Sequence, residues 1–89
     1  MQVYYNSQNI SLHFWAWCIQ KRISSNGLII KHNISAKTFH IKIPFQNAIE
    51  LDKLLSEGVS MNDFINKLNS YDVDGAEWYA MFMQNGIIE

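Results

Sequence analysis

Three histidines and one cysteine are the side chains of this sequence that chemistry would use most readily. His13, His32 and His40 lack the close spacing of metal ligands, and every Asp and Glu lies beyond residue 44. Cys18 stands alone, which excludes an internal disulfide and a cysteine-rich zinc site. Its apolar neighbours are more typical of a small buried side chain than of a nucleophile. We therefore predict no metal, no cofactor and no enzyme activity.

Peptide binding is the chemistry that the sequence favours instead. Residues 38–44 alternate cleanly, with Phe39, Ile41 and Ile43 on one face of a strand. Residues 75–85 carry more large apolar side chains than one buried helix stripe requires. An exposed strand edge can take up an extended peptide as an added strand, while a hydrophobic helix selects its side chains. The residues expected to contact such a peptide are Lys37, Thr38, Phe39, His40, Ile41, Lys42, Trp78, Tyr79 and Phe82.

The elements that would position these residues are clearest in the second half of the chain. Ser60 stands three residues before Asp63, and Asp74 stands three residues before Glu77, which is the spacing of residues that cap helix starts. These pairs predict helices over 61–69 and 75–85, the second ending at Asn85-Gly86. A wide apolar stripe over 45–57, following Pro44 and ending at Gly58, predicts a third helix before them.

The first half of the chain is predicted to consist mainly of strands. Residues 2–6 indicate an edge strand, and Asn26-Gly27 has the residue types of a tight hairpin turn. Such a turn would pair strand 17–24 with strand 28–33, joining Ser25 to Leu28, Ser24 to Ile29 and Ile23 to Ile30. Residues 10–17 fit helical spacing as well as a strand buried on both faces, so their conformation stays open.

The resulting fold class is α+β in a single domain over residues 1–89. An antiparallel sheet of about three strands (1–44) precedes a three-helix unit (45–89) and is expected to pack against it. The winged-helix-like character of this small domain is implied by the resemblance described below. No stretch is long and apolar enough to cross a membrane, and the first residues do not form a signal peptide. We therefore expect a cytoplasmic protein.

Charge is divided unevenly along the chain. Residues 1–44 contain five Lys or Arg and no acid, whereas residues 45–89 contain two Lys and eight acids. Either the two halves attract each other within one fold, or the first half offers a basic surface to an acidic partner. The expected helix over 75–85 has no Lys or Arg, so we predict no binding of duplex DNA.

The order of these elements resembles the PqqD-like RiPP recognition element, a winged-helix domain. The likeness covers about residues 39–88 and is carried by the spacing of Leu51, Leu54, Leu55 and Gly58, then Val59-Ser60, Phe64-Ile65, Leu68, Phe82 and Gly86-Ile87-Ile88. At Ile43-Pro44-Phe45 the sequence departs from the Leu-Asn pair that many members carry. The resemblance implies a non-catalytic module that captures the leader peptide of a precursor and presents it to a modification enzyme.

By that resemblance, the leader would pair with the strand at 37–42 and pack against the last helix. Thr38, His40 and Lys42 would then point outward, while Tyr79 and Phe82 would face the peptide. Two alternatives stay open. An unpaired strand edge would also allow a homodimer. A small protein with divided charge is also typical of a phage-encoded inhibitor or an immunity protein that blocks a partner enzyme, including one that processes nucleic acid.

Overall fold

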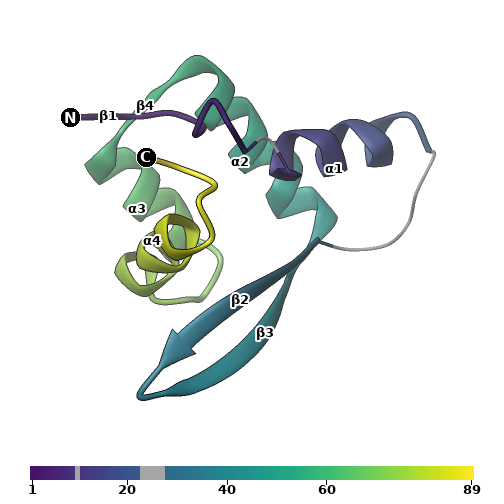
Figure 1. Cartoon of the computed structure of the whole chain (residues 1–89). Helices are drawn as coiled ribbons and strands as arrows, with labels where there is room; N and C mark the ends of the chain where they lie inside the picture. The colour runs from purple at the N-terminus through teal and green to yellow at the C-terminus, as the bar shows by residue number, and fades with distance from the viewer. Residues whose placement is uncertain (10, 23–27) are drawn as a thin grey trace.

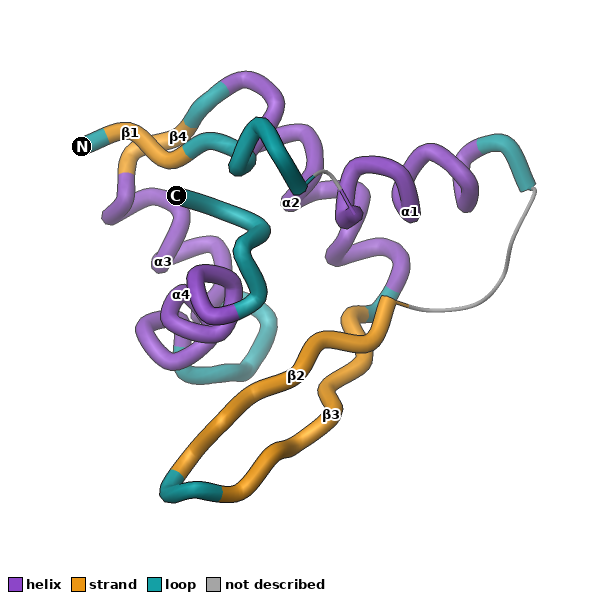
Figure 2. Tube along the Cα trace, viewed as in Figure 1, coloured by secondary structure: helices purple, strands orange, loops and turns teal. Residues whose placement is uncertain are grey.

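The computed structural model describes residues 1–9, 11–22 and 28–89. Within these ranges the chain is α+β, as predicted, with four helices and two antiparallel sheets of two strands each (Figures 1 and 2). The predicted sheet of about three strands is wrong, because the strands form two separate pairs. In chain order the elements are β1 (Gln2–Val3), α1 (Ser11–Gln20), β2 (Leu28–Ile34), β3 (Lys37–Ile43), α2 (Phe45–Glu57), β4 (Val59–Ser60), α3 (Met61–Asn69) and α4 (Gly75–Gln84).

The three helices of the second half lie where the sequence predicts them. The Ser60 hydroxyl accepts a hydrogen bond from the Asp63 N–H at 3.1 Å, and the Asp74 carboxylate accepts from two N–H groups of the first turn of α4. These bonds satisfy backbone donors that a helix start leaves free. Helix α4 ends one residue earlier than predicted, and Gly86 follows it in the left-handed conformation with φ +68°.

Helices α3 and α4 pack closely at Gly75. Its N–H donates to the Asn69 side-chain oxygen at 2.7 Å, and a Cβ at this position would collide with the carbonyl oxygen of Ile65. Glycine therefore allows the two backbones to approach. Further along, the Phe64 ring of α3 packs against the rings of Tyr79 and Phe82, with centroids 6.2 and 5.9 Å apart.

The two ends of the chain close this helical unit. β1 pairs with β4, with Val3 opposite Val59, and Tyr5 forms an isolated bridge with Ile88. The predicted edge strand over 2–6 is therefore shorter than expected. Both termini lie on the same side of the molecule in Figure 1, next to the β1–β4 pair.

Helix α1 shows that the strand predicted over residues 17–24 is wrong at residues 17–20, whereas residues 23–24 lie outside the described residues. Residues 11–20 are helical, with Leu12, Trp15 and Ala16 buried on the face toward the core. The sequence left 10–17 open between helix and strand, and the helical spacing of these three residues holds. Phe14 and Trp17 stay 62% and 44% exposed and stack on each other. The predicted Asn26-Gly27 turn and its three residue pairs lie outside the described residues.

The core is one cluster of apolar side chains drawn from every helix and from the β2–β3 hairpin. It includes Leu12 of α1, Ile30 of β2, Ile43 of β3 and Leu51 of α2, together with Phe64 and Phe82. The hairpin contributes to this core at one end and projects from the body at the other (Figure 1). No helix in the described part of the chain has the length and apolar character needed to cross a membrane.

Candidate functional site

The β2–β3 hairpin is the element that carries most of the predicted site residues. Its register pairs Ile34 with Lys37 next to the turn and Leu28 with Ile43 at the far end. Ser35 and Ala36 form the turn, with φ of +51° and +64°. Two consecutive positive φ angles define a type I′ turn, whose twist matches that of the strands it joins. Strand β3 is thus confirmed over the region that the alternation predicted.

This register determines which main-chain groups point away from the hairpin. In an antiparallel pair joined by a two-residue turn, the residues that flank the turn exchange hydrogen bonds, and every second residue after them does the same. On β3 the groups of Lys37, Phe39 and Ile41 therefore face β2. The N–H and C=O groups of the residues between them, Thr38, His40 and Lys42, face the other way. On β2 the same rule turns the groups of Lys31 and Asn33 outward.

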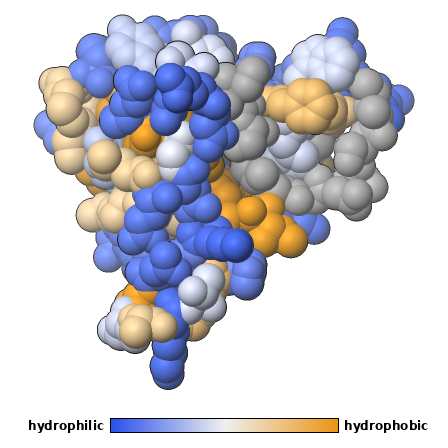
Figure 3. All heavy atoms as spheres, viewed as in Figure 1, coloured by the Kyte–Doolittle hydropathy of each residue, from blue (hydrophilic) through white to orange (hydrophobic). Residues whose placement is uncertain are grey.

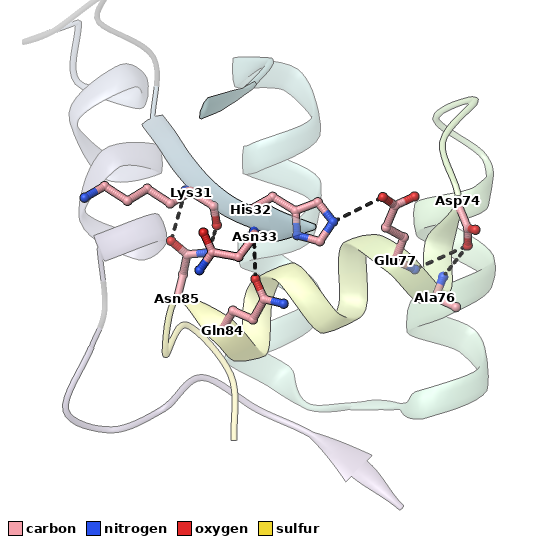
Figure 4. A network of polar contacts seen from close by, with 8 residues as sticks. All are labelled: Lys31, His32, Asn33, Asp74, Ala76, Glu77, Gln84 and Asn85. Atoms are coloured by element: carbon pink, nitrogen blue, oxygen red, sulfur yellow. Dashed lines mark hydrogen bonds and ion pairs between the residues drawn. The ribbon is translucent and has the colours of Figure 1, made fainter. Parts of the chain in front are cut away.

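The outer edge of β2, which we call the closed edge, is bonded to the end of α4. The Asn85 side-chain amide accepts from the Lys31 N–H at 3.1 Å and donates to the Lys31 carbonyl at 2.5 Å. The Gln84 side-chain oxygen accepts from the Asn33 N–H at 3.2 Å (Figure 4). These two side chains therefore take the place of a third strand. Asn85 also donates to the Met81 carbonyl at 2.7 Å, which fixes its orientation.

A buried histidine holds the same edge to the start of α4. His32 is only 4% exposed, and Nε2 of its ring lies 3.1 Å from the Glu77 carboxylate. The Asp74 cap fixes the first turn of α4, on which Glu77 stands (Figure 4). The ring's other nitrogen, Nδ1, is buried and has no hydrogen-bond partner among the described residues. Since Glu77 accepts, we assign the ring proton to Nε2.

The outer edge of β3, which we call the open edge, has no such cover. Across the described ranges, no residue bonds to the outward main-chain groups of Thr38, His40 and Lys42, and β3 is the last strand of its sheet. The side chains of residues 37–40 and of Lys42 are exposed, and that of Ile41 is partly buried. Figure 2 shows β3 on the side of β2 that faces away from α4. Six predicted site residues thus lie together on an accessible strand.

The three site residues predicted on α4 lie elsewhere. Tyr79 is 9% exposed and Phe82 is fully buried against Phe64, so the expectation that both face a peptide is wrong. Trp78 is partly buried and packs against the core. The surplus apolar surface of α4 is used mainly to contact α3. Of the residues beside them, Met83 points outward and is 47% exposed.

The order of the elements corrects a second expectation. The sequence suggested that a peptide on the strand at 37–42 would also pack against the last helix. In the structure β2 lies next to α4 and is bonded to it (Figure 4), and β3 lies beyond β2 (Figure 2). The open edge and α4 are therefore separated by a strand. No local sequence signal carried this result, because Asn85 and Lys31 are 54 residues apart.

A second polar cluster lies at the junction of α1 with α2. The Asp52 carboxylate accepts from the Tyr5 hydroxyl at 2.6 Å and lies 2.8 Å from Nδ1 of His13. Burial, together with the bond to this carboxylate, raises the pKa of Tyr5. A carboxylate that orients a histidine is one part of a catalytic triad, but a nucleophile is also required. Cys18, which lies on α1 like His13, is only 7% exposed. The sequence predicted that this side chain is buried.

This cluster holds the fold together, since it joins the N-terminal segment, α1 and α2. Sequence reasoning missed it because its three members are separated by up to 47 residues. Within residues 1–9, 11–22 and 28–89, no group of three or more His, Cys, Asp or Glu side chains is arranged to hold a metal ion.

The charges of the two halves are used differently. Several carboxylates are engaged in the fold: Asp52 by His13 and Tyr5, Glu77 by His32, and Glu50 by Lys67. By contrast, none of the five Lys and Arg side chains of residues 1–44 forms an ion pair with a described residue. Lysines and arginines of the first half therefore do not bind the acids of the second half directly. They remain available to an external partner.

Comparison with known proteins does not add a relative to this picture. No protein-family model matches the chain, and no significant match to a curated protein or to a solved structure was found. The resemblance to the RiPP recognition element stays a prediction from the sequence. What bears on function is therefore the geometry of the hairpin.

Proposed function

We propose that this protein binds an extended peptide, which adds to the open edge of β3 as a third strand of the hairpin. The observation that carries the proposal is the difference between the two edges. The outward main-chain groups of Lys31 and Asn33 on β2 are bonded by side chains of α4. Those of Thr38, His40 and Lys42 on β3 are not bonded by any described residue. A peptide backbone can supply the missing partners.

The nature of the peptide follows from the sequence resemblance. In a PqqD-like RiPP recognition element, a winged-helix domain binds the leader peptide of a precursor and has no catalytic role itself. We propose the same role here, with a cytoplasmic modification enzyme as the partner that receives the bound precursor. The unpaired cations of the first half suit an acidic leader. The binding residues are then those of β3, without the two buried aromatic residues of α4.

The alternative function, inhibition of an enzyme by an acidic surface, gains no specific observation. An acidic surface that imitates nucleic acid needs free carboxylates aimed at a cationic groove. Asp52, Glu77 and Glu50 are bonded by His13, His32 and Lys67, and Asp74 caps α4, so four of the eight acids are already used within the fold. The open edge is on the cationic half of the sequence instead. We therefore develop the peptide-binding proposal only.

The decisive experiment uses proline at the centre of the open edge. In His40→Pro the outward N–H is lost, while the bonds between β2 and β3 are kept, because the His40 N–H does not take part in them. Binding of short candidate leader peptides is followed by amide chemical shifts of the labelled protein. It should weaken about tenfold or more, because one hydrogen bond to the bound peptide is lost and the proline ring obstructs the edge. In the wild type the shifts should concentrate on residues 37–43.

The matched control is His40→Ala, which removes the imidazole and keeps the N–H. It should retain most of the affinity if the main chain of β3 holds the peptide. Far-UV circular dichroism and the spectrum of the core methyl groups should show that both variants fold. Equal affinities of His40→Pro and wild type would refute the proposal, as would shifts that avoid β3.

A further inference from the structure

The two faces of the β2–β3 hairpin differ in chemistry, and this difference extends to any strand added at the open edge. Residues directly opposite each other in an antiparallel pair share a face. One face contains the pairs Ile30–Ile41, His32–Phe39 and Ile34–Lys37, together with Ile43, so that it is apolar except for His32 and for Lys37 beside the turn. The other contains Lys31–His40, Ile29–Lys42 and Asn33–Thr38. We call them the apolar face and the cationic face.

The apolar face is not completely covered by the body of the protein. Ile30 and Ile43 are buried in the core at one end of the hairpin. Toward the turn, Phe39 is 47% and Ile34 39% exposed, and they stand next to each other diagonally across the strands. The hydropathy view in Figure 3 shows apolar side chains among polar ones at the lower end of the molecule, where the hairpin projects. An added strand could bury part of this surface.

The cationic face carries lysine charges that no carboxylate of the hairpin neutralises. Lys31, His40 and Lys42 are exposed on it, and neither strand of the hairpin contains Asp or Glu. Among the described residues, no carboxylate lies within ion-pair distance of Lys31 or Lys42. A ligand that places acidic side chains here would gain attraction without competing against a carboxylate of the protein.

We infer that the ligand of the open edge is a segment in which acidic and apolar residues alternate. Its acidic residues lie opposite Lys42 and His40 on the cationic face, and its apolar residues lie opposite Ile41 and Phe39 on the apolar face. The inference rests on the proposed function and specifies the class of peptide that the site accepts. In an antiparallel addition the acidic residues are also the ones whose main chain bonds to β3, because the groups of His40 and Lys42 point outward.

A second copy of this chain suits the edge less well. If two β3 strands paired antiparallel about His40, each Phe39 would meet an Ile41, which is favourable. On the other face, however, His40 would meet His40 and Lys42 would meet Thr38, so Lys42 would gain no carboxylate. The acidic peptide therefore satisfies both faces, whereas the homodimer satisfies one.

The test compares two peptides of equal composition against the full chain by amide chemical shifts. The alternating peptide has the core Glu-Val-Glu-Val-Thr, and the block peptide has Glu-Glu-Val-Val-Thr, both with Gly-Ser ends. We expect the alternating peptide to bind at least about tenfold more tightly, and more weakly as salt is raised. A third peptide with Lys in place of both Glu should bind weakly to the wild type. It should bind better than the Glu peptide to Lys42→Glu.

N-methylated peptides separate a failure of this inference from a failure of the proposed function. Methylation of the two Glu nitrogens removes the bonds to β3, and methylation of the two Val nitrogens leaves them intact. If only the first change abolishes binding but the block or Lys peptide binds as well as the alternating one, strand addition stands and this inference is overturned. If no peptide responds to methylation, the proposed function fails as well. Shifts of β3 amides that depend on protein concentration alone would assign the edge to a second copy, and would overturn the inference.

Discussion

Both edges of the β2–β3 hairpin carry main-chain groups that point outward, but the two edges differ in whether the protein supplies hydrogen-bond partners for these groups. Each strand has a row of N–H and C=O groups that point outward. These groups require hydrogen-bond partners, whether they are buried or exposed to water. On the closed edge, Asn85 and Gln84 at the end of α4 supply them. On the open edge the described residues supply none. A helix end that carries two amide side chains can thus complete a sheet without a strand.

The difference also separates stability from binding. The closed edge joins the hairpin to the body of the protein, so changes there should alter the free energy of unfolding. The open edge has no intramolecular bonds to lose, so changes there should alter the affinity for a peptide and little else. The predictions below test this separation, beginning with the largest effect on stability.

The largest effect is expected at Asn85. In Asn85→Ala the two bonds to Lys31 and the bond to the Met81 carbonyl are lost. At roughly 0.5–1.5 kcal/mol for each bond, the free energy of unfolding should fall by about 2–3 kcal/mol. Urea denaturation, followed by tryptophan fluorescence, measures this loss in the free energy of unfolding. Hydrogen exchange should show that the Lys31 amide loses protection while the amides of α2 keep theirs.

Gln84→Ala is the matched control for Asn85→Ala. It removes one exposed bond, to the Asn33 N–H, and should cost only about 0.5–1 kcal/mol. Neither variant should change the affinity for a peptide at the open edge by more than about twofold, provided that it is measured well below the denaturation midpoint. A large loss of affinity in either variant would show that the two edges are coupled, and the comparison would then fail.

The hairpin turn should respond in the opposite direction. Ser35 and Ala36 both have positive φ, which costs a non-glycine residue about 1 kcal/mol or more. The double variant Ser35→Asn and Ala36→Gly provides the residues that a type I′ turn prefers, so we expect a gain in stability of about 1–2 kcal/mol. Thermal unfolding by circular dichroism measures this gain. Because neither edge is altered, the peptide should bind at least as well as before.

Ala36→Val is the corresponding negative control. A β-branched side chain is strained at positive φ, so this variant should be less stable than the wild type. If the glycine variant were no more stable and the valine variant no less stable, the turn would not have the type I′ conformation. The register of the hairpin, and with it the assignment of the open edge to Thr38, His40 and Lys42, would then be in doubt.

Local signals were enough to predict the second half of the chain. The bounds of α2 and α3 were predicted to the residue and those of α4 to within one, because Ser60, Asp74 and Gly58 mark helix ends by interactions with nearby backbone. The alternation of residues 38–43 likewise located β3. Each of these signals acts over a few residues, which is why the sequence shows it directly.

The first half depended on contacts that no local pattern contains. The sequence left residues 10–17 open between a helix and a strand, and Asn26-Gly27 led to the prediction of a strand over 17–24. Residues 11–20 form a helix because Leu12, Trp15 and Ala16 are buried together on one face of it. Similarly, the burial of Tyr79 and Phe82 depends on Phe64 of the neighbouring helix. In both regions, packing between elements determines the conformation or burial of the residues. The spacing of residues along the chain does not reveal this packing.

The smallest effect is expected at Glu50 of α2, which pairs with Lys67 of α3 and bonds to neither edge of the hairpin. A hydrogen bond from the Lys67 ammonium, together with its charge and a bond from Tyr71, lowers the pKa of this carboxyl below its ordinary value of 4.5. The stabilisation is therefore complete above about pH 4.5 and is lost as the pH falls through the lowered pKa. Glu50→Gln should be slightly less stable than the wild type at pH 7, by less than either edge variant, since the pair is exposed to solvent. Denaturation curves at pH 7 and pH 3 should show that this difference shrinks in acid, while Gln84→Ala keeps its own difference, because no carboxylate takes part in that bond. A difference for Glu50→Gln that grew in acid would contradict the sign of the pKa shift and would show that the carboxylate has another role in the fold.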